Sequence, residues 1–274
     1  MTRKIDSAGK LLMAAVQNNP ALMRLAEDTV IASGASRGLD LLMTIERWQA
    51  RAASIPPPEG INPARGGLPG PAFFPEAYGL SNPSGSVLPS VMVVGHNWGC
   101  AAYRDEIDGR GREDDKPTWR GLSRVLAAAG GSIAECFMTN WFVGLLPGAL
   151  QCRRRFLLHP EPEFENACRK LLLDQIAFLR PRAVLLLGLE VARHAHEIFE
   201  AAAPWANARN WAALDRSAAG PVISGAAVLE LGIQTNLCAL IHPSLAWPNR
   251  RYRRSLFPED DDPEASILRA ALGL

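Results

Sequence analysis

The stretch VMVVGHNWG, residues 91–99, decides the fold that we expect for this chain. It opens with four apolar residues, three of them β-branched, and a glycine ends the run, which is typical of a buried strand followed by a tight loop. Three further apolar runs lie downstream, together with a weaker strand candidate. They occupy residues 133–138, 183–187 and 237–241, and the weaker candidate occupies 226–231.

Helical spacing fills the intervals between these runs, at 119–129, 163–179 and 189–203. Buried strands that alternate with helices predict a three-layer α/β/α sandwich around a central, mostly parallel sheet of four or five strands. Ligands bind at the carboxyl ends of the strands in such sheets. We therefore expect the polar residues that follow the runs to share one rim: His96, Asn97, Asn140 and His242.

The chain before residue 91 has a different texture. Residues 1–54 have helical spacing and predict an N-terminal extension of two or three helices. Residues 55–90 are rich in proline and glycine and predict an irregular arm that wraps a surface or links two units. Residues 91–274 then form the α/β domain, and we expect one compact unit.

Composition excludes several classes. The 274 residues are 48% hydrophobic and 21% charged with a net charge of +1, which excludes disorder, collagen and coiled coil. We expect a cytoplasmic protein with no membrane partner, since no apolar run approaches the length of a membrane span or a secretory core. The five cysteines contain no Cys-x-x-Cys pair, so we expect reduced and mostly buried thiols.

The basic residues are unevenly distributed. Of 29 lysines and arginines, 25 are arginines, a bias that phosphate binding or a GC-rich genome would equally produce. Basic clusters lie at 153–155 and 250–254, and an acidic run lies at 259–262. This pattern suits a nearly neutral protein that meets a polyanion on one face.

Each candidate segment also has a plain structural explanation. Residues 95–99 are either a glycine-bracketed turn or a backbone that lets a ligand approach closely. Asn140 either caps the next element or reads the edge of a base. His242 is either structural or catalytic, but it opens a basic loop with proline punctuation, in which Leu245 or Trp247 has the size of a wedge that enters a base stack.

Taken together, these segments resemble the uracil-DNA glycosylase superfamily. In that superfamily a G-x-D/N/E-P/W-x motif follows the first strand, an asparagine ends the second, and His-Pro-Ser ends the last. Residues 95–99, Asn140 and residues 242–244 match these motifs in order. Residues 181–188 resemble the Pro-Lys-Val-apolar-Leu-Gly strand of the family, and the resemblance covers residues 88–255.

The resemblance implies base flipping, with removal of uracil to leave an abasic site for base excision repair. Asn97 would hold the attacking water, and His242 would stabilise the departing uracil anion. The substrate-binding residues would be His96, Trp98, Gly99, Tyr103 and Asn140, with Tyr103, or else Trp119, as the stacking aromatic. The DNA-binding residues would be Ser244, Leu245, Trp247, Arg250, Arg251 and Arg154.

The sequence also departs from the family pattern. Asn97 stands where the most active branches have aspartate, which implies slower or broader activity because an amide cannot take a proton from water. Gly99 stands where one branch has the tyrosine that excludes the thymine methyl, so 5-substituted uracils become plausible substrates unless His96 or Trp98 closes the gap. Cys168 resembles one ligand of the iron–sulfur branch, but the other ligands are missing, so we expect neither metal nor cofactor.

The leading hypothesis is therefore a monomeric uracil-DNA glycosylase, an N-glycosyl hydrolase that needs no cofactor. A second hypothesis is a non-catalytic or product-retaining DNA-binding protein on the same scaffold, which Asn97 and the unmatched first 54 residues suggest. A small-molecule hydrolase is the third, although no Gly-x-Ser-x-Gly elbow follows any of the predicted strands.

Overall fold

The computed structural model describes residues 44, 47–63, 90–110, 116–133, 136–148, 161–257 and 262–274, without the side chains of 107–110 and 245–250. Five strands form one sheet in the order β2-β1-β3-β5-β4. Their bounds are Val91–Gly95 (β1), Cys136–Asn140 (β2), Ala183–Leu187 (β3), Val222–Ala227 (β4) and Gln234–Leu240 (β5). All neighbouring pairs are parallel except β4 and β5.

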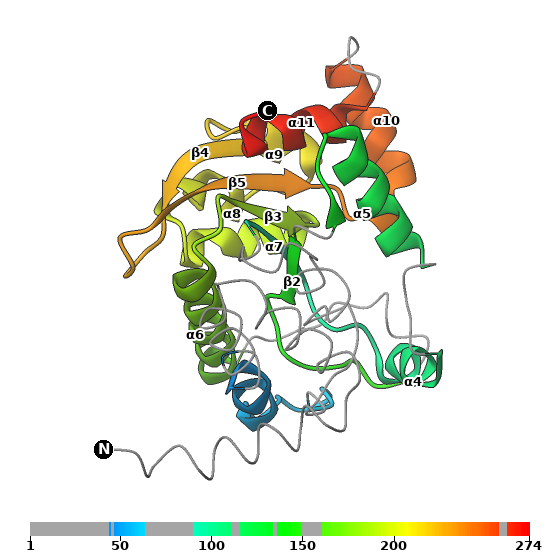
Figure 1. Cartoon of the computed structure of the whole chain (residues 1–274), viewed down its shortest axis with the longest axis vertical. Coiled ribbons are helices and arrows are strands. Elements are labelled where there is room, and N and C mark those ends of the chain that lie inside the picture. Colours follow the sequence, from blue (N-terminus) through cyan, green and yellow to red (C-terminus); the bar gives the residue numbers. More distant parts are fainter. Residues whose placement is uncertain are drawn as a thin grey trace, which may run out of the picture.

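Helices cover both sides of this sheet (Figure 1), so the predicted sandwich with a mostly parallel sheet is confirmed. The longer helices are Ala101–Arg110 (α4), Pro117–Ala128 (α5), Pro162–Leu179 (α6), Ala246–Leu256 (α10) and Pro263–Leu272 (α11). The shorter ones are Leu189–His194 (α7), Ala203–Ala206 (α8) and Trp211–Asp215 (α9), with 3-10 turns at Ala195–Glu197 (η3), Glu200–Ala202 (η4) and Pro243–Leu245 (η5).

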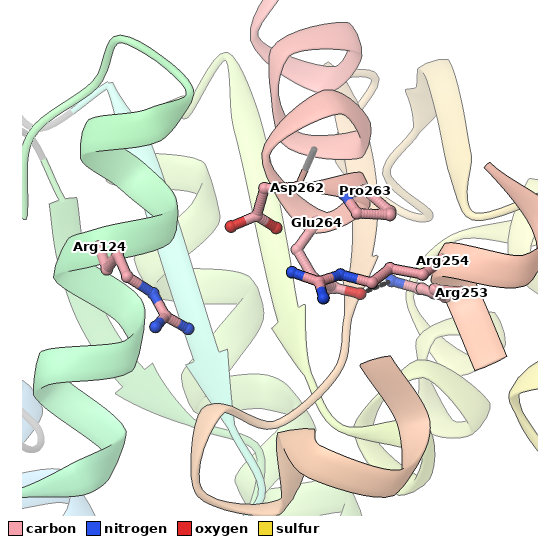
Figure 2. A pocket seen from close by; sticks show the side chains of 6 residues that line it. All are labelled: Arg124, Arg253, Arg254, Asp262, Pro263 and Glu264. Atoms are coloured by element: carbon pink, nitrogen blue, oxygen red, sulfur yellow. Dashed lines mark hydrogen bonds and ion pairs between the residues drawn. The ribbon is translucent and has the colours of Figure 1, made fainter. Parts of the chain in front are cut away.

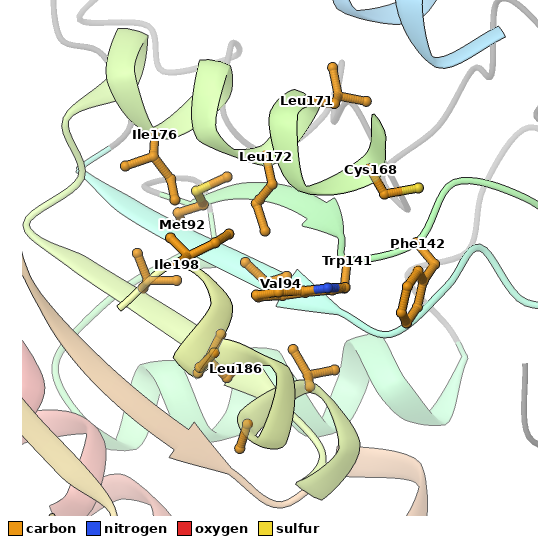
Figure 3. Close-up of a cluster of buried hydrophobic side chains, with 14 of the residues drawn as sticks. Met92, Val94, Trp141, Phe142, Cys168, Leu171, Leu172, Ile176, Leu186 and Ile198 are labelled. Atoms are coloured by element: carbon orange, nitrogen blue, oxygen red, sulfur yellow. The ribbon is translucent and has the colours of Figure 1, made fainter. Parts of the chain in front are cut away.

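Alternate residues of the strands enter two separate cores. Met92 and Val94 of β1 face α6 and α7, whereas Val91 and Val93 face α5 and α11. Figure 3 shows the first of these cores, with Leu172 and other side chains of α6 lying over the sheet. Both faces are buried, which is why the parallel strands read as continuous apolar runs.

Several predicted element bounds were wrong. The run at 133–138 becomes a strand that ends at Asn140, because its pairing with β1 continues through Gly95. The candidate at 226–231 is displaced to β4, since residues 229–231 form the turn into β5. The single helix predicted at 189–203 is broken into shorter pieces, because Phe199 is extended and forms a bridge with Val228.

The predicted loop after His242 is also wrong, because residues 246–256 form α10. Pro248 lies in the first turn of this helix, where a backbone N–H has no acceptor within the helix and proline is therefore tolerated. The sequence was read as a basic loop because four of the eleven residues of this helix are arginine.

The described part of the N-terminal region packs on the α/β domain. Trp48 is buried and meets the rings of Phe137 and Phe178 edge-on, at 5.7 and 5.6 Å between centroids. Farther along, Asn62 and Leu145 form an isolated antiparallel bridge with two backbone hydrogen bonds. The described residues 47–63 thus contribute to the same core as the sheet.

The cysteine prediction holds only in part. Cys136, Cys168 and Cys238 are free and buried, as expected, and Cys168 accepts a hydrogen bond from the Val143 N–H at 3.4 Å. Cys100, however, is disulfide-bonded, which corrects the expectation that all thiols are reduced. Within the described ranges, no helix combines the length and the apolar character needed to cross a membrane.

Candidate functional site

A cavity of about 280 Å³ opens at the carboxyl ends of the parallel strands. This edge is the place where an α/β sheet binds ligands. The cavity brings together all seven residues predicted for catalysis and substrate binding. They are His96, Asn97, Trp98, Gly99, Tyr103, Asn140 and His242; its remaining lining residues are Val93, Gly95, Thr118, Trp119, Met138, Thr139 and Leu187.

The Asn140 carboxamide lies directly over Gly95. The two residues are register partners in neighbouring strands, and a Cβ atom built on Gly95 would lie 2.3 Å from Oδ1 of Asn140. Only glycine leaves room for this arrangement. The preceding residue, Thr139, donates to Oε1 of buried Gln175 on α6 at 3.0 Å, which fixes the end of β2.

The Asn97 carboxamide is held by its own loop. Its Nδ2 donates to the carbonyl oxygen of Gly99 at 3.0 Å, and Gly99 adopts a left-handed φ of 86° that turns the backbone back towards it. The amide oxygen has two lone pairs, so it can accept a hydrogen bond from a ligand or a water molecule in addition to its bond with His96.

His96 is an uncharged ring at the junction of the cavity and the core. Burial, together with the nearby charge of His194, lowers its pKa to about 4, although a hydrogen bond with Asn97 opposes the shift. Its ring meets Phe142 edge-on at 5.3 Å. His96 is therefore neutral at pH 7 and contacts Asn97 from the core side.

The geometry around His242 fixes its tautomer. Nδ1 receives the hydroxyl of Ser244 at 2.8 Å and the backbone N–H of Ser244 at 3.4 Å. A backbone N–H can only donate, so Nδ1 carries the lone pair and Nε2 carries the hydrogen. Burial also lowers the pKa of His242 to about 4. His242 thus lines the cavity as a neutral imidazole with one N–H donor.

The backbone on both sides of His242 is tightly held. A Cβ atom on Gly121 of α5 would lie 2.7 Å from Cβ of Pro243, so α5 and η5 touch at a point where only glycine fits. On the other side, the Ile241 N–H donates to Oε2 of Glu264 at 3.0 Å. These contacts fix the backbone on both sides of His242 and therefore the position of its imidazole after β5.

Glu264 belongs to a buried ionic network centred on Arg253. The Arg253 guanidinium is fully buried and bonds to Glu264 at 2.7 Å, to both oxygens of Asp215 at 2.8 and 3.1 Å, and to the carbonyl oxygen of Ala239 at 3.0 Å. It also lies 4.6 Å from the ring centroid of Trp211. One arginine of the basic cluster is therefore structural and joins the end of β5 to α9, α10 and α11.

Aromatic side chains supply the apolar part of the cavity. Trp98 and Trp119 are buried, whereas Tyr103 is half-buried and has the Lys116 ammonium 5.5 Å from its ring centroid. The nearest atom to a Cβ built on Gly99 is Cδ1 of Tyr103, at 3.4 Å. Tyr103 thus lies beside Gly99, next to the gap that was expected to admit 5-substituted uracils unless His96 or Trp98 closed it.

The residues predicted to bind DNA are only partly placed. Ser244 is exposed in η5, where it orients the imidazole of His242 through the hydrogen bond described above. Leu245 ends η5, and Arg251 is exposed on α10. The side chains of Trp247 and Arg250, and the whole of Arg154, lie outside the described residues.

Sequence reasoning missed Gly121, Thr118 and Glu264 as parts of this site. No motif marks them, because Gly121 and Glu264 act through contacts with residues 241–243 that only the folded chain reveals. Within the described ranges, no group of histidine, cysteine or carboxylate side chains has the arrangement of a metal site. No known protein-family model matches the sequence, and no curated protein does either.

Proposed function

We propose that this protein is a DNA glycosylase that hydrolyses the N-glycosidic bond of uracil, with slower action on other modified pyrimidines. The observation that carries the proposal is the convergence of one neutral imidazole and two carboxamides, from His242, Asn97 and Asn140, on a single cavity lined by aromatic rings. A cavity near the lower end of the roughly 300–1,000 Å³ typical of small-ligand sites suits a single base.

Asn140 is the residue that distinguishes uracil from cytosine. Its carboxamide accepts from N3–H and donates to O4 of uracil, and cytosine lacks that proton and presents an amine in place of O4. A mismatched pair of this kind costs about 1–3 kcal/mol per unsatisfied group. The glycine at position 95 supports this role because any residue with a Cβ atom there would displace the amide.

His242 stabilises the leaving group. When the bond between C1′ and N1 breaks, the bonding electrons leave with uracil and negative charge develops on its O2. A neutral imidazole whose Nε2–H donates to O2 stabilises this charge. Such preorganised donors are worth about 10²–10³ in rate. The Ser244 contacts to Nδ1 support the role, because they select the tautomer that can donate.

Asn97 positions the water that completes the reaction. Its oxygen accepts a hydrogen bond from a water molecule, whose oxygen then bonds to C1′ of the cationic sugar. The proton released from water passes to solvent or to the departing uracil, since an amide cannot take it. We therefore expect a slower enzyme than one with a carboxylate at this position.

The test is an oligonucleotide that contains one deoxyuridine, incubated with the protein and then treated with alkali to cleave abasic sites. We expect scission at that position, and loss of scission in His242→Ala and Asn140→Ala. Retention of the DNA on a gel without any scission would refute catalysis and favour the second hypothesis, a DNA-binding protein that Asn97 leaves inactive. A DNA affinity that does not change with salt concentration would favour a small-molecule ligand as the true substrate.

A further inference from the structure

The two helices that flank the His242 turn have an unusual charge. α5 and α10 both contact η5, which joins His242 to α10. Together they contain six arginines and no aspartate or glutamate. The chain as a whole has a net charge of only +1, so the positive charge is concentrated beside the cavity.

Most of this charge is available to an external partner. The guanidinium of Arg253 is bonded to Glu264 and Asp215 inside the protein, and the side chain of Arg250 lies outside the described residues. The other four arginines are exposed, and within the described part of the chain none of them has a hydrogen-bond or ion-pair partner for its guanidinium. We call them the α5–α10 arginine surface: Arg120, Arg124, Arg251 and Arg254.

Two members of this surface face a common hollow. Figure 2 shows Arg124 extending from α5 and Arg254 from α10 towards the same space, and a cavity of about 170 Å³ lies there. Asp262 also lines the hollow but pairs with neither guanidinium within the described residues. Among the described residues, one free carboxylate faces two guanidinium groups in this hollow, which is also lined by the ion pair of Arg253 and Glu264.

The spacing along α5 suits a nucleic-acid strand. Arg120 lies two residues after Thr118, which lines the base-sized cavity, and Arg124 lies one turn farther on, about 6 Å along the helix axis. Phosphates of one DNA strand follow one another at about 3.4 Å of duplex axis. The pair therefore spans about two successive phosphates that begin next to the cavity.

We infer that the α5–α10 arginine surface binds the phosphates that flank the flipped nucleotide, with Arg120 and Arg124 of α5 as contacts in addition to those on α10. The inference rests on the proposed function for the identity of the nucleotide, but the phosphate contact itself requires no excision. It assigns to α5 a DNA-binding role that no motif in the sequence indicates.

The experiment measures the binding of an undamaged duplex oligonucleotide by fluorescence anisotropy at several salt concentrations. The plot of log K against log salt has a negative slope, and each lost phosphate contact makes it shallower by about 0.9. We expect the double variant Arg120→Gln/Arg124→Gln to make the slope shallower by about 1.8 without changing the melting temperature, since both side chains are exposed. Arg182→Gln is the matched control, because Arg182 is exposed at the opposite edge of the sheet.

A double variant that keeps the wild-type slope would overturn the inference, and so would an Arg182→Gln variant that loses as much. Because the probe contains no uracil, the result is independent of catalysis. A protein that binds this duplex with the expected slopes but excises nothing supports the arginine surface and refutes the glycosylase. Excision that is unaffected by salt and by the double variant supports the glycosylase and refutes the arginine surface.

Discussion

Replacing Gly95 with alanine tests whether the Asn140 amide is held where the proposal needs it. The new Cβ would lie 2.3 Å from Oδ1 of Asn140, whereas Cβ atoms essentially never come within 3.0 Å of another heavy atom. The amide must therefore withdraw by at least about 0.7 Å, enough to take a hydrogen bond of normal length outside its useful range. Because a side chain can rotate away, the fold itself should tolerate the change.

We expect Gly95→Ala to reduce uracil excision by about 10-fold to 100-fold, which corresponds to the loss of about 1–3 kcal/mol of base recognition. Stability should change little, since the contact is to the end of one side chain. The assay is single-turnover excision on a deoxyuridine oligonucleotide, with thermal unfolding measured in parallel. Gly131→Ala is the control, because the nearest atom to a Cβ there is 3.6 Å away.

The double variant Gly95→Ala/Asn140→Ala makes the test specific. If Gly95 acts through Asn140, the double variant should be no slower than Asn140→Ala alone, which is the non-additivity expected of two residues that share one function. Fully additive losses, or wild-type activity in Gly95→Ala, would refute the reasoning that ties the glycine to the amide.

Three further predictions follow from the same site. Asn97→Asp should raise the excision rate by about 10-fold or more, because a carboxylate can accept the proton of the attacking water, and stopped-time excision assays measure the change. Glu264→Ala should lower the free energy of unfolding in urea by about 1–3 kcal/mol for each buried group that loses its acceptor, namely the Ile241 N–H and one N–H of the Arg253 guanidinium, which Asp215 keeps paired. Acidification from pH 6.5 to 4 should lower the melting temperature, because the pKa values of His96 and His242 are depressed to about 4 in the folded protein, so only the unfolded chain takes up these protons in that range.

Controls and contrary results define these three tests. An Asn97→Asp variant slower than the wild type would contradict the water-positioning role. Asp174→Ala removes an exposed ion pair and should cost only about 0–1 kcal/mol, so an equal loss in Glu264→Ala would argue against the buried network. A variant with both histidines replaced by glutamine should lose stability less steeply between pH 6.5 and 4, and an unchanged slope would contradict the depressed pKa values.

The sheet and the edge at which the cavity opens were predictable because their signals are local. Each parallel strand is buried on both faces and ends at a glycine or a polar residue, so runs such as 183–187 reveal both the strand and the edge where it ends. His96, Asn97, Asn140 and His242 were expected at one rim, and they line one cavity. Parallel pairing alone brings together residues that lie far apart in the chain.

The supporting contacts were not predictable because they depend on tertiary packing. Arg253 belongs to a basic cluster that looks exposed throughout, yet it is the one described arginine that the fold buries completely. Gly121 reads as a weak point in a helix, but it is the place where α5 meets Pro243. The disulfide at Cys100 has no sequence signal, since the cysteines show no regular spacing.

The most direct measurement for the central claim is the detection of free base by liquid chromatography after incubation with DNA. We predict that free uracil appears in an amount equal to the abasic sites formed, that a matched oligonucleotide with cytosine at the same position releases no base, and that His242→Ala reduces the rate by about 10²–10³. Wild-type protein that releases no uracil from either single-stranded or double-stranded DNA would contradict the claim.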